Sequence, residues 1–471
     1  MTTLIWLRQD LRLADNPALA AAAPGPVVLA FVLDEDGPWR PGGATRWWLH
    51  HSLAALAQAL TARGNRLVLL KGDALAEIPR FAATIGATAV HWNRRWEPGE
   101  PAREAEMGRR LAAGGIGHRA FAADLLFEPG TVRTKSGGSF QVFTPFWRAA
   151  LALPEPARPL PPPAALPLPP GVPAGMALEA LGLMPAITWW QTMAGTWRPG
   201  EDGAAARLAA FLDHGLESYD RERDRPDHDG TSMLSPHLAF GEISPRQIWH
   251  AVRTRAPSAG AETFLKELGW REFSHQLIAS FPDLATQPLQ PAFAAFPWAE
   301  DDAALAAWRR GRTGFPIVDA GMRQLWATGW MHNRVRMIVG SFLVKDLLLP
   351  WQAGERWFWD TLVDANAAAN AASWQWVAGC GADAAPYFRV FNPITQGEKF
   401  DPTGSYVRRW VPELAGLSDQ YIHKPWDAPP LILAGARVRL GVSYPAPMVD
   451  HAKARLRALA AYAEIKAAPR G

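Results

Sequence analysis

The sequence predicts an α/β, Rossmann-like N-terminal domain followed by a larger all-helical C-terminal domain. In the first third of the chain, short apolar runs alternate with alanine-rich helical patterns, and this alternation is typical of a parallel sheet covered by helices. Residues 152–173 are rich in proline, so we expect an extended connector there rather than a regular helix or strand. Beyond about residue 200 the strand signal fades and helical periods dominate.

The expected elements follow from the same patterns. Apolar runs predict strands at residues 3–7, 27–33, 66–70 and 89–92. Helical periods predict helices at 47–62 and 101–113, and after the connector at 203–214, 261–280 and 315–348.

These elements place the α/β domain at residues 1–130, the connector at 131–200 and the helical domain at 201–471. No G-x-G-x-x-G follows the first strand, so a dinucleotide at that turn is not predicted.

Composition excludes several classes of protein. Cys380 is the only cysteine, which excludes disulfides, cysteine-based zinc sites and iron–sulfur clusters within one chain. No run reaches the roughly 18 apolar residues of a membrane span, and the N-terminal segment carries charge by Arg8, so we expect a cytoplasmic protein. A net charge of +3 is compatible with a polyanionic partner but equally with many soluble enzymes.

Tryptophan is the unusual residue. The chain has 23, of which 16 follow the proline-rich residues 152–173. Leucine and alanine fill helix interfaces with less volume per contact, so this enrichment indicates that the helical domain holds an aromatic ligand or moves electrons, although packing alone also produces Trp-rich cores.

Two stretches combine polar and aromatic residues in patterns that suit a ligand. Residues 230–236 present hydroxyl and N–H groups near an expected helix start, which suits a phosphate, although ordinary helix capping gives the same pattern. On the helix that follows, Glu267, Trp270, Arg271 and Ser274 share one face. A surface helix with salt bridges is the alternative, but a Trp within such a face suits stacking on a base.

Two further stretches are compatible either with a site or with plain core. Asn333, Arg334, Arg336 and Met337 lie within two turns of one another. In residues 364–376, a run of alanines lets a large flat group approach the backbone, and Asn370 is the only polar side chain in the middle of it. Trp374 and Trp376, also in that stretch, would point in opposite directions on a helix, about 200° apart.

Together these stretches resemble the photolyase/cryptochrome family, and specifically the class I cyclobutane-dimer photolyases. The match is dense over residues 311–337 and 372–402 and looser over 231–273 and the N-terminal WLRQDLRLADNPAL. The resemblance implies a DNA-repair enzyme, a carbon–carbon lyase. Excited reduced FAD would donate an electron to a flipped-out cyclobutane pyrimidine dimer, and the cofactor rather than a nucleophilic side chain would carry the chemistry.

The resemblance implies a set of residues around the FAD. The expected cofactor contacts are Tyr219, Thr231, Ser232, Met233, Leu234, Ser235, Phe264, Arg271, Asn333, Arg336, Asp364, Ala365, Asn366 and Asn370. Arg336 and Asp364 are expected to form an ion pair.

The family pattern assigns Asn370 to flavin N5, where an amide can accept a hydrogen bond without adding a charge. Plant cryptochromes have Asp there, so Asn favours repair over signalling. Trp374, Trp351 and Trp298 match the chain of rings that carries electrons to the flavin in light.

The substrate residues carried over by resemblance form the expected DNA face. Trp270 and Trp376 would stack on the dimer, and Glu267 would hydrogen-bond a pyrimidine edge. The full set is Arg223, Glu267, Trp270, Arg271, Asn333, Arg334, Met337, Trp376 and Gln396. The (6-4) photolyases have a second His directly after the position of His332, where this chain has Asn333, and this difference argues against (6-4) repair.

Several points depart from the family pattern or stay open. Asn366 stands where the family usually has Asp, so we expect easier flavin reduction or altered bonding at flavin N3–H.

The family often holds an antenna, a methenyltetrahydrofolate or an 8-hydroxy-deazaflavin. Glu100 matches a folate-contacting acid while Gly99 replaces an expected Asn, so folate, deazaflavin and no antenna all stay open. We expect a monomeric enzyme that binds UV-damaged DNA, holds no metal and does not associate with membranes. The competing functions are a blue-light receptor and an electron-transfer flavoprotein.

Overall fold

The computed structural model describes residues 1–37, 39–384 and 388–467. Residues 385–387, within the segment 372–402 that carries the family resemblance, lie outside the described residues. The chain forms two compact units, each described separately below. The first comprises Met1–Glu217, Ser232–Pro282 and Val363–Ala368, and the second comprises Ser218–Thr231, Asp283–Leu362 and Ala369–Gly471. The predicted domain limits stay predictions.

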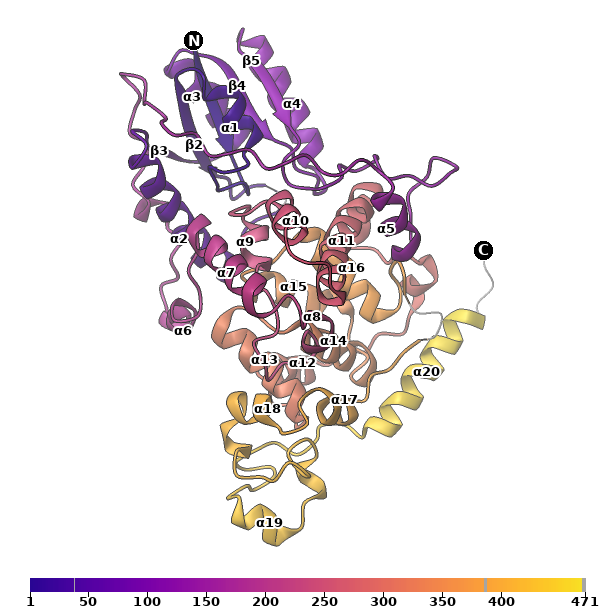
Figure 1. Cartoon of the computed structure of the whole chain (residues 1–471). Coiled ribbons are helices and arrows are strands. Elements are labelled where there is room, and N and C mark those ends of the chain that lie inside the picture. The colour runs from indigo at the N-terminus through magenta and orange to yellow at the C-terminus, as the bar shows by residue number, and fades with distance from the viewer. Residues whose placement is uncertain (38, 385–387, 468–471) are drawn as a thin grey trace. The chain divides into compact units, whose positions relative to one another are not determined.

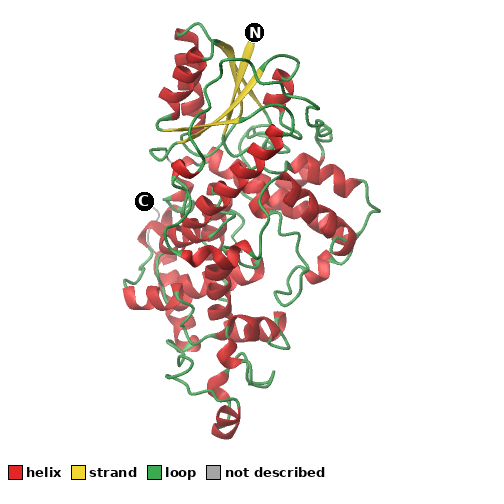
Figure 2. Cartoon of the chain, turned by 90° about the vertical axis from the view of Figure 1, so that its left-hand side faces the viewer, coloured by secondary structure: helices red, strands yellow, loops and turns green. Residues whose placement is uncertain are grey.

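The first unit contains a five-stranded parallel sheet of order β3-β2-β1-β4-β5 (Figures 1 and 2). Its strands are β1 (Thr2–Leu7), β2 (Val27–Leu33), β3 (Leu67–Lys71), β4 (Ala87–Asn93) and β5 (Gly117–Phe121). The four predicted strands are confirmed. The sequence did not predict β5, because this edge strand is largely exposed and carries no apolar run.

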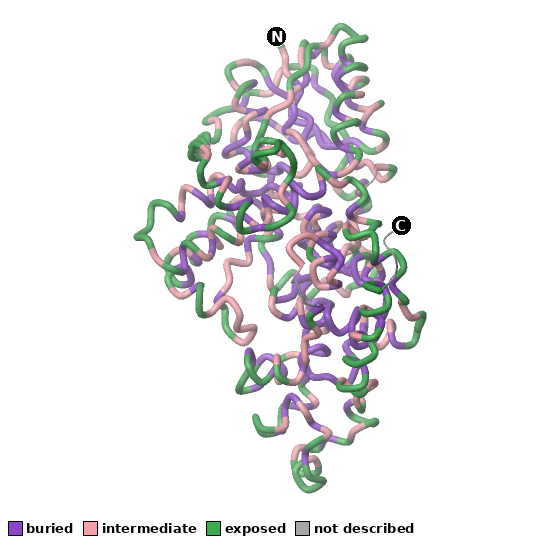
Figure 3. Tube along the Cα trace, turned by 90° about the vertical axis from the view of Figure 1, so that its right-hand side faces the viewer, coloured by how far each residue is buried: buried purple, intermediate pink, exposed green. Residues whose placement is uncertain are grey.

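Helices cover both faces of the sheet. These are α1 (Pro17–Ala22), α2 (Gly43–Thr61), α3 (Ala74–Thr84) and α4 (Glu100–Ala113). Right-handed crossovers place α1 and α2 on one face and α3 and α4 on the other, so every residue of β2 is buried. Figure 3 colours the chain by the burial of each residue. The strand order reverses between β1 and β4, and ligands of such sheets bind in the crevice beyond the carboxyl ends of the strands at that point.

The rest of the first unit is helical, apart from the connector. Residues 154–178 form no helix or strand, as the proline content predicts. The helices are α5 (Phe143–Leu151), η1 (Glu179–Leu181), η2 (Thr188–Trp190), α6 (Gln191–Ala194), α7 (Glu201–His214), α9 (Ser235–Ala239), α10 (Pro245–Arg253) and α11 (Ala259–Ser280). Helix α11 packs on α5 through Gly269, where a Cβ atom would lie 2.5 Å from Trp147.

The described residues of the second unit are mainly helical. Its helices are α8 (Tyr219–Glu222), η3 (Pro282–Ala285), η4 (Pro291–Ala295), α12 (Asp302–Arg309), α13 (Pro316–Thr328), α14 (Asn333–Ser341), η5 (Phe342–Asp346), α15 (Trp351–Thr361), α16 (Ala367–Ala378), α17 (Pro393–Phe400), α18 (Ser405–Trp410), η6 (Pro412–Leu414), η7 (Pro425–Asp427), α19 (Pro430–Gly435) and α20 (His451–Ala467). Within the parts of the chain that the structure describes, none of the helices has the length and apolar character needed to cross a bilayer.

The helical pattern of residues 315–348 is divided between separate helices, because the chain turns between α13 and α14. Gly329 ends α13 in the left-handed region with φ 66°, which glycine adopts without steric strain. His332 then caps α14 with its own side chain. The turn places Asn333 at the first position of a new helix.

Candidate functional site

The start of α14 presents the polar residues that the sequence singled out. The ring Nδ1 of His332 accepts a hydrogen bond from the Arg334 backbone at 3.2 Å, so in the neutral ring the proton lies on Nε2. His332 is 3% exposed, and burial lowers its pKa to about 4. Arg334 donates to Asp224 at 2.7 Å, Arg336 donates to the Met331 carbonyl at 2.8 Å, and Asn333 is exposed.

Asn370 on α16 is oriented by a buried carboxyl group. Its Nδ2 donates to the Glu355 carboxyl at 2.7 Å and to the Glu355 backbone carbonyl at 3.1 Å. Burial raises the pKa of Glu355. Because the amino group of Asn370 faces Glu355, its carbonyl oxygen faces the other way and is presented as an acceptor.

Trp374 lies on the buried face of α16 and is 3% exposed. A Cβ atom at Gly354 would lie 2.1 Å from its ring, so only glycine fits there. The indole N–H of Trp374 is buried and has no hydrogen-bond partner among the described residues, as expected of a donor that faces a ligand. Its ring contacts Phe358 at 5.0 Å and Trp308 at 6.2 Å.

The other tryptophans differ in burial. Trp376 is partly exposed and donates to the Asp383 carbonyl at 3.1 Å, so Trp374 and Trp376 do lie in different surroundings. Trp351 is 1% exposed. Trp298 is partly exposed and packs on Phe296 at 4.3 Å. Their electron-transfer roles stay predictions.

The remaining candidates of the second unit lie on short segments. Arg223 lies over the ring of the buried Tyr219, 5.4 Å from its centroid. Thr231 is partly exposed, and Gln396 is partly exposed on α17. Met337 is half-buried on α14.

In the first unit, the hydroxyl-rich segment is a strained turn rather than the start of a long helix. Met233 has φ 49°, a conformation that non-glycine residues adopt mainly at special sites. The Ser232 hydroxyl accepts from the Leu234 backbone at 3.4 Å, and Ser235 is exposed. Helix α9 has only five residues, so its macrodipole adds little to phosphate binding.

The predicted face of α11 is partly occupied by the protein itself. Trp270 stacks on Phe143 with ring centroids 3.9 Å apart and an interplanar angle of 9°, so only the opposite face of the indole can serve a base. Glu267 is partly exposed, while Phe264 is buried against Phe211 with ring centroids 4.5 Å apart.

Arg271 is bound by two carboxyl groups of the first unit. It donates to the Asp124 carboxylate at 2.8 Å and lies 3.3 Å from Glu272. Its proposed contact with flavin or DNA therefore stays a prediction. Asp364 and Ala365 are buried; the expected pair of Arg336 and Asp364 joins residues of different units and also stays a prediction.

Asn366 has a neighbour that sequence reasoning missed. Its Nδ2 lies 3.5 Å from Nε2 of His275 on α11, and His275 is fully buried. Close to His275 lies a set of charged residues that the sequence analysis also missed, of which Glu97 and Glu272 are buried and Arg95 and Asp124 are partly buried. These residues are far apart in the sequence, so local patterns carry no signal of the cluster.

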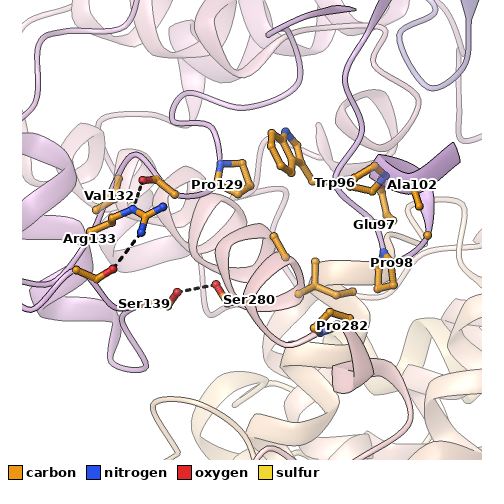
Figure 4. A pocket seen from close by; sticks show the side chains of 16 residues that line it. Trp96, Glu97, Pro98, Ala102, Pro129, Val132, Arg133, Ser139, Ser280 and Pro282 are labelled. Atoms are coloured by element: carbon orange, nitrogen blue, oxygen red, sulfur yellow. Dashed lines mark hydrogen bonds between the residues drawn. The ribbon is translucent and has the colours of Figure 1, made fainter. Parts of the chain in front are cut away.

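A pocket of about 510 Å³ lies within the first unit, at the loops that follow β4 and β5. Figure 4 shows Trp96, Glu97 and Pro98 on one side and Arg133 and Ser139 on the other, with Ser280 from α11 between them. Burial would raise the pKa of Glu97, but its ion pair with Arg95 outweighs this and lowers it. The volume suits a small organic ligand.

Glu100, the acid that the sequence suggested for a folate site, does not face this pocket. Glu100 pairs with Arg8 at 2.9 Å and does not line the pocket, whereas Gly99 and Glu97 do. Glu97 is thus a pocket residue that sequence reasoning missed.

Comparisons with known proteins cover nearly the whole chain. Residues 3–165 match the family model described as DNA photolyase, and residues 264–464 match the FAD binding domain of DNA photolyase. A deoxyribodipyrimidine photo-lyase of Agrobacterium fabrum is 50% identical over 470 residues, which covers 98% of each chain. The chain belongs to the photolyase/cryptochrome family.

Both branches of that family are represented among its relatives. Cryptochrome-1 of Arabidopsis thaliana is 40% identical over 493 residues, covering 99% of this chain and 71% of that protein. A crystal structure of a bacterial class III photolyase from Agrobacterium tumefaciens superposes with a TM-score of 0.96 at 50% identity, covering 99% of this chain and 98% of that one.

The residues present fit FAD, the cofactor of this family. In the second unit, the unpartnered indole N–H of Trp374 and the oriented oxygen of Asn370 both lie on the alanine-rich α16. Small side chains leave room for a flat ring system. One donor and one acceptor match the edge of a flavin, which carries both hydrogen-bond acceptors and N–H donors.

Proposed function

We propose that the protein repairs cyclobutane pyrimidine dimers in DNA in a light-dependent reaction. The observation that carries this proposal is the 50% identity, across 98% of both chains, to a deoxyribodipyrimidine photo-lyase. Bound in its reduced form, FAD supplies light-driven one-electron transfer to the dimer.

The side chains then have binding and orienting roles. Asn370, fixed by Glu355, offers a neutral acceptor to the flavin. Trp270 and Trp376 offer one indole face each to a dimer that has left the DNA stack, while the partly exposed Glu267 accepts from a pyrimidine N–H. The Trp374, Trp351 and Trp298 rings would pass electrons from an external reductant to an oxidised flavin in light.

The remaining assigned residues divide between cofactor and DNA. We propose that Tyr219, Thr231, Ser232, Met233, Leu234, Ser235, Phe264, Arg336, Asp364, Ala365 and Asn366 contact the cofactor. Arg223, Arg334, Met337 and Gln396 would contact DNA, where basic groups hold the flanking phosphates. Asn333 and Arg271 are proposed for both. The enzyme would act in the cytoplasm as a monomer.

Within the family, we propose that the chain falls with the class III photolyases. The sequence analysis expected class I, but the structure that superposes with a TM-score of 0.96 is described as class III. At 50% identity over nearly the full length, the two chains are expected to share their subgroup.

We propose the pocket of the first unit as the antenna site. Its lining combines an indole, Trp96, with the buried carboxylate of Glu97 and the exposed cation Arg133. A folate offers a planar ring with N–H donors and a glutamate tail with negative charge, and these groups match Glu97 and Arg133. A deazaflavin has no comparable set of terminal carboxylates, so we favour the folate.

A blue-light receptor is the second candidate, since Arabidopsis cryptochrome-1 is 40% identical over 99% of the chain. Asn370 favours repair, because the carboxamide is held as a neutral acceptor by Glu355.

The two candidates are separated by incubating the reduced holoprotein with an oligonucleotide that carries one thymine dimer, in light and in darkness. Repair predicts light-dependent loss of the dimer. Glu267→Gln is expected to slow repair at unchanged FAD content, whereas Glu262→Gln, an exposed position on the same helix, is the matched control. FAD-loaded protein that leaves the dimer intact in light would support the receptor.

A further inference from the structure

A buried leucine of the second unit holds a backbone conformation that proteins normally leave to glycine. Leu348 has φ 58°, in the left-handed region, where L-residues other than Asn and Asp are uncommon. It is only 5% exposed. Such outliers persist where the surrounding structure holds them in place, and they cluster at functional sites. Leu348 is therefore a candidate for a residue that serves the function of the molecule.

The conformation of Leu348 follows from the way in which the preceding helix ends. Residues Phe342–Asp346 form a π-helical turn, η5, and such turns are frequent at functional sites. The Leu349 backbone N–H donates back to the Leu343 carbonyl at 3.1 Å. The chain therefore reverses at Leu348, as it does at the left-handed residue that ends many helices.

The turn presents the backbone carbonyl of Leu348 to a distant segment of the same unit. This oxygen accepts a hydrogen bond from the Ala299 backbone N–H at 2.8 Å. Ala299 directly follows Trp298, and Leu348 lies three residues before Trp351, which begins α15. One backbone hydrogen bond thus ties together the segments that carry two of the tryptophans proposed for electron transfer.

The segment around Trp298 has no regular structure of its own. Residues 296–301 form no helix or strand. The Trp298 backbone N–H donates to the Phe296 carbonyl at 2.8 Å, and the two rings lie 4.3 Å apart. Both of these contacts are local, so it is the bond from Ala299 to Leu348 that relates this segment to the start of α15.

We propose that Leu348 is a positioning residue for electron transfer, because its left-handed turn fixes Trp298 relative to Trp351. The inference rests on the proposed roles of these two tryptophans. In that step one electron passes from the Trp298 ring to the oxidised Trp351 ring, so Trp351 becomes neutral again and Trp298 carries the positive charge. The rate of such a transfer falls steeply as two rings move apart, so loss of the hydrogen bond should slow it.

Two substitutions of Leu348 separate backbone conformation from packing. Glycine adopts a positive φ without strain but removes the whole buried side chain. Valine keeps most of the apolar volume, but a β-branched residue is strongly disfavoured at positive φ. If Leu348 served only packing, Leu348→Gly would be the more damaging change. If its backbone conformation matters, Leu348→Val is the more damaging one.

The measurement is the lifetime of the tryptophan radical signal after a light flash, recorded on FAD-loaded protein with oxidised flavin. Trp298→Phe gives the lifetime for a chain that lacks its last ring. We expect Leu348→Gly to retain the wild-type lifetime and Leu348→Val to lose it, falling toward that of Trp298→Phe. A wild-type lifetime in Leu348→Val, or a shorter one in Leu348→Gly than in Leu348→Val, would overturn the proposal.

A second variant removes the hydrogen bond and leaves Leu348 untouched. Lactic acid in place of Ala299 replaces the backbone N–H by an ester oxygen, keeps the methyl side chain, and should shorten the lifetime as Leu348→Val does. The control is the same replacement at Ala303, exposed in the first turn of α12, where backbone N–H groups have no acceptor within the helix. An ester at position 299 that leaves the wild-type lifetime unchanged would overturn the proposal.

Hydrogen exchange at the Ala299 amide needs neither light nor flavin. Exchange should be slow in the wild type and in Leu348→Gly and faster in Leu348→Val, because the last variant opens the turn. Equal exchange in the two variants would count against the proposal. None of these readouts uses DNA, whereas repair is measured on a dimer with reduced protein, so a failure of this inference and a failure of the repair proposal are distinguishable.

Discussion

Glu272 is expected to make the stability of the protein depend on pH around neutrality. Its side chain is fully buried and accepts from the Leu126 and Phe127 backbones at 2.8 and 3.0 Å. Burial raises its pKa to about 7 from 4.5, although Arg271 and the two N–H donors oppose this. The nearby carboxylate of Asp124 adds to this rise, because two negative charges side by side disfavour ionisation.

The sign follows from linkage. The folded-state pKa lies above the unfolded one, so the protonated carboxyl contributes stability that is fully present below pH 4.5 and is lost as pH rises through about 7. The shift is about 7 minus 4.5, or about 2.5 pKa units, and each unit is worth about 1.36 kcal/mol. Ionisation should therefore lower the free energy of unfolding by about 3 kcal/mol between pH 4.5 and pH 8.

The assay compares wild type with Glu272→Gln by urea denaturation at a series of pH values. Glutamine keeps an acceptor for the two backbone N–H groups but cannot ionise. The free energy of unfolding of the variant should therefore increase, relative to that of the wild type, as pH rises. Glu262→Gln on the same helix is exposed and should track the wild type at every pH. Parallel pH profiles for wild type and Glu272→Gln would refute the reasoning.

Three further changes test other parts of the structure. Gly354→Ala should displace Trp374, whose ring would lie 2.1 Å from the new Cβ, and slow photoreduction of oxidised flavin by an external thiol; an unchanged rate would contradict the role of Trp374. Glu355→Ala removes the 2.7 Å acceptor of Asn370 and should destabilise the protein by about 1–3 kcal/mol, measured by denaturation; Glu398→Ala, exposed on α17, is the comparison. Lys345 is buried and burial lowers its pKa from 10.5 to about 7, so stability is fully present above pH 10.5 and is lost as pH falls from there to about 7. Lys345→Met should abolish that loss in melting scans over the same pH range.

Much of the fold followed from local pattern. The four strands that the sequence predicted are the ones with continuous apolar runs, because strands buried on both faces must be apolar throughout. The fifth, β5, is an exposed edge strand of sequence GHRAF and leaves no such pattern. The break at Gly329 within the expected helix 315–348 depended on a left-handed turn, and the helical period continues across it.

The candidate site divides in the same way. Asn370 stood out because it is polar within a run of alanines, but its partner Glu355 could not be inferred from a local pattern. The partners of α11 are still more distant in sequence: Glu272 binds backbone groups 145 and 146 residues away. Only the folded chain shows that Arg271, which sequence pattern and resemblance assigned to the ligand, also neutralises buried acids.

One end of the Asn370 carboxamide is fixed by the protein. Its amino group donates to the carboxyl group and the backbone carbonyl of Glu355, so its neutral oxygen faces the other way. A neutral acceptor can bond a flavin N–H without the repulsion that a carboxylate exerts on an electron-rich reduced ring. Repair requires the reduced ring, so an ordered carboxamide at position 370 suits a photolyase, and the charge at this position should set the balance between repair and flavin oxidation.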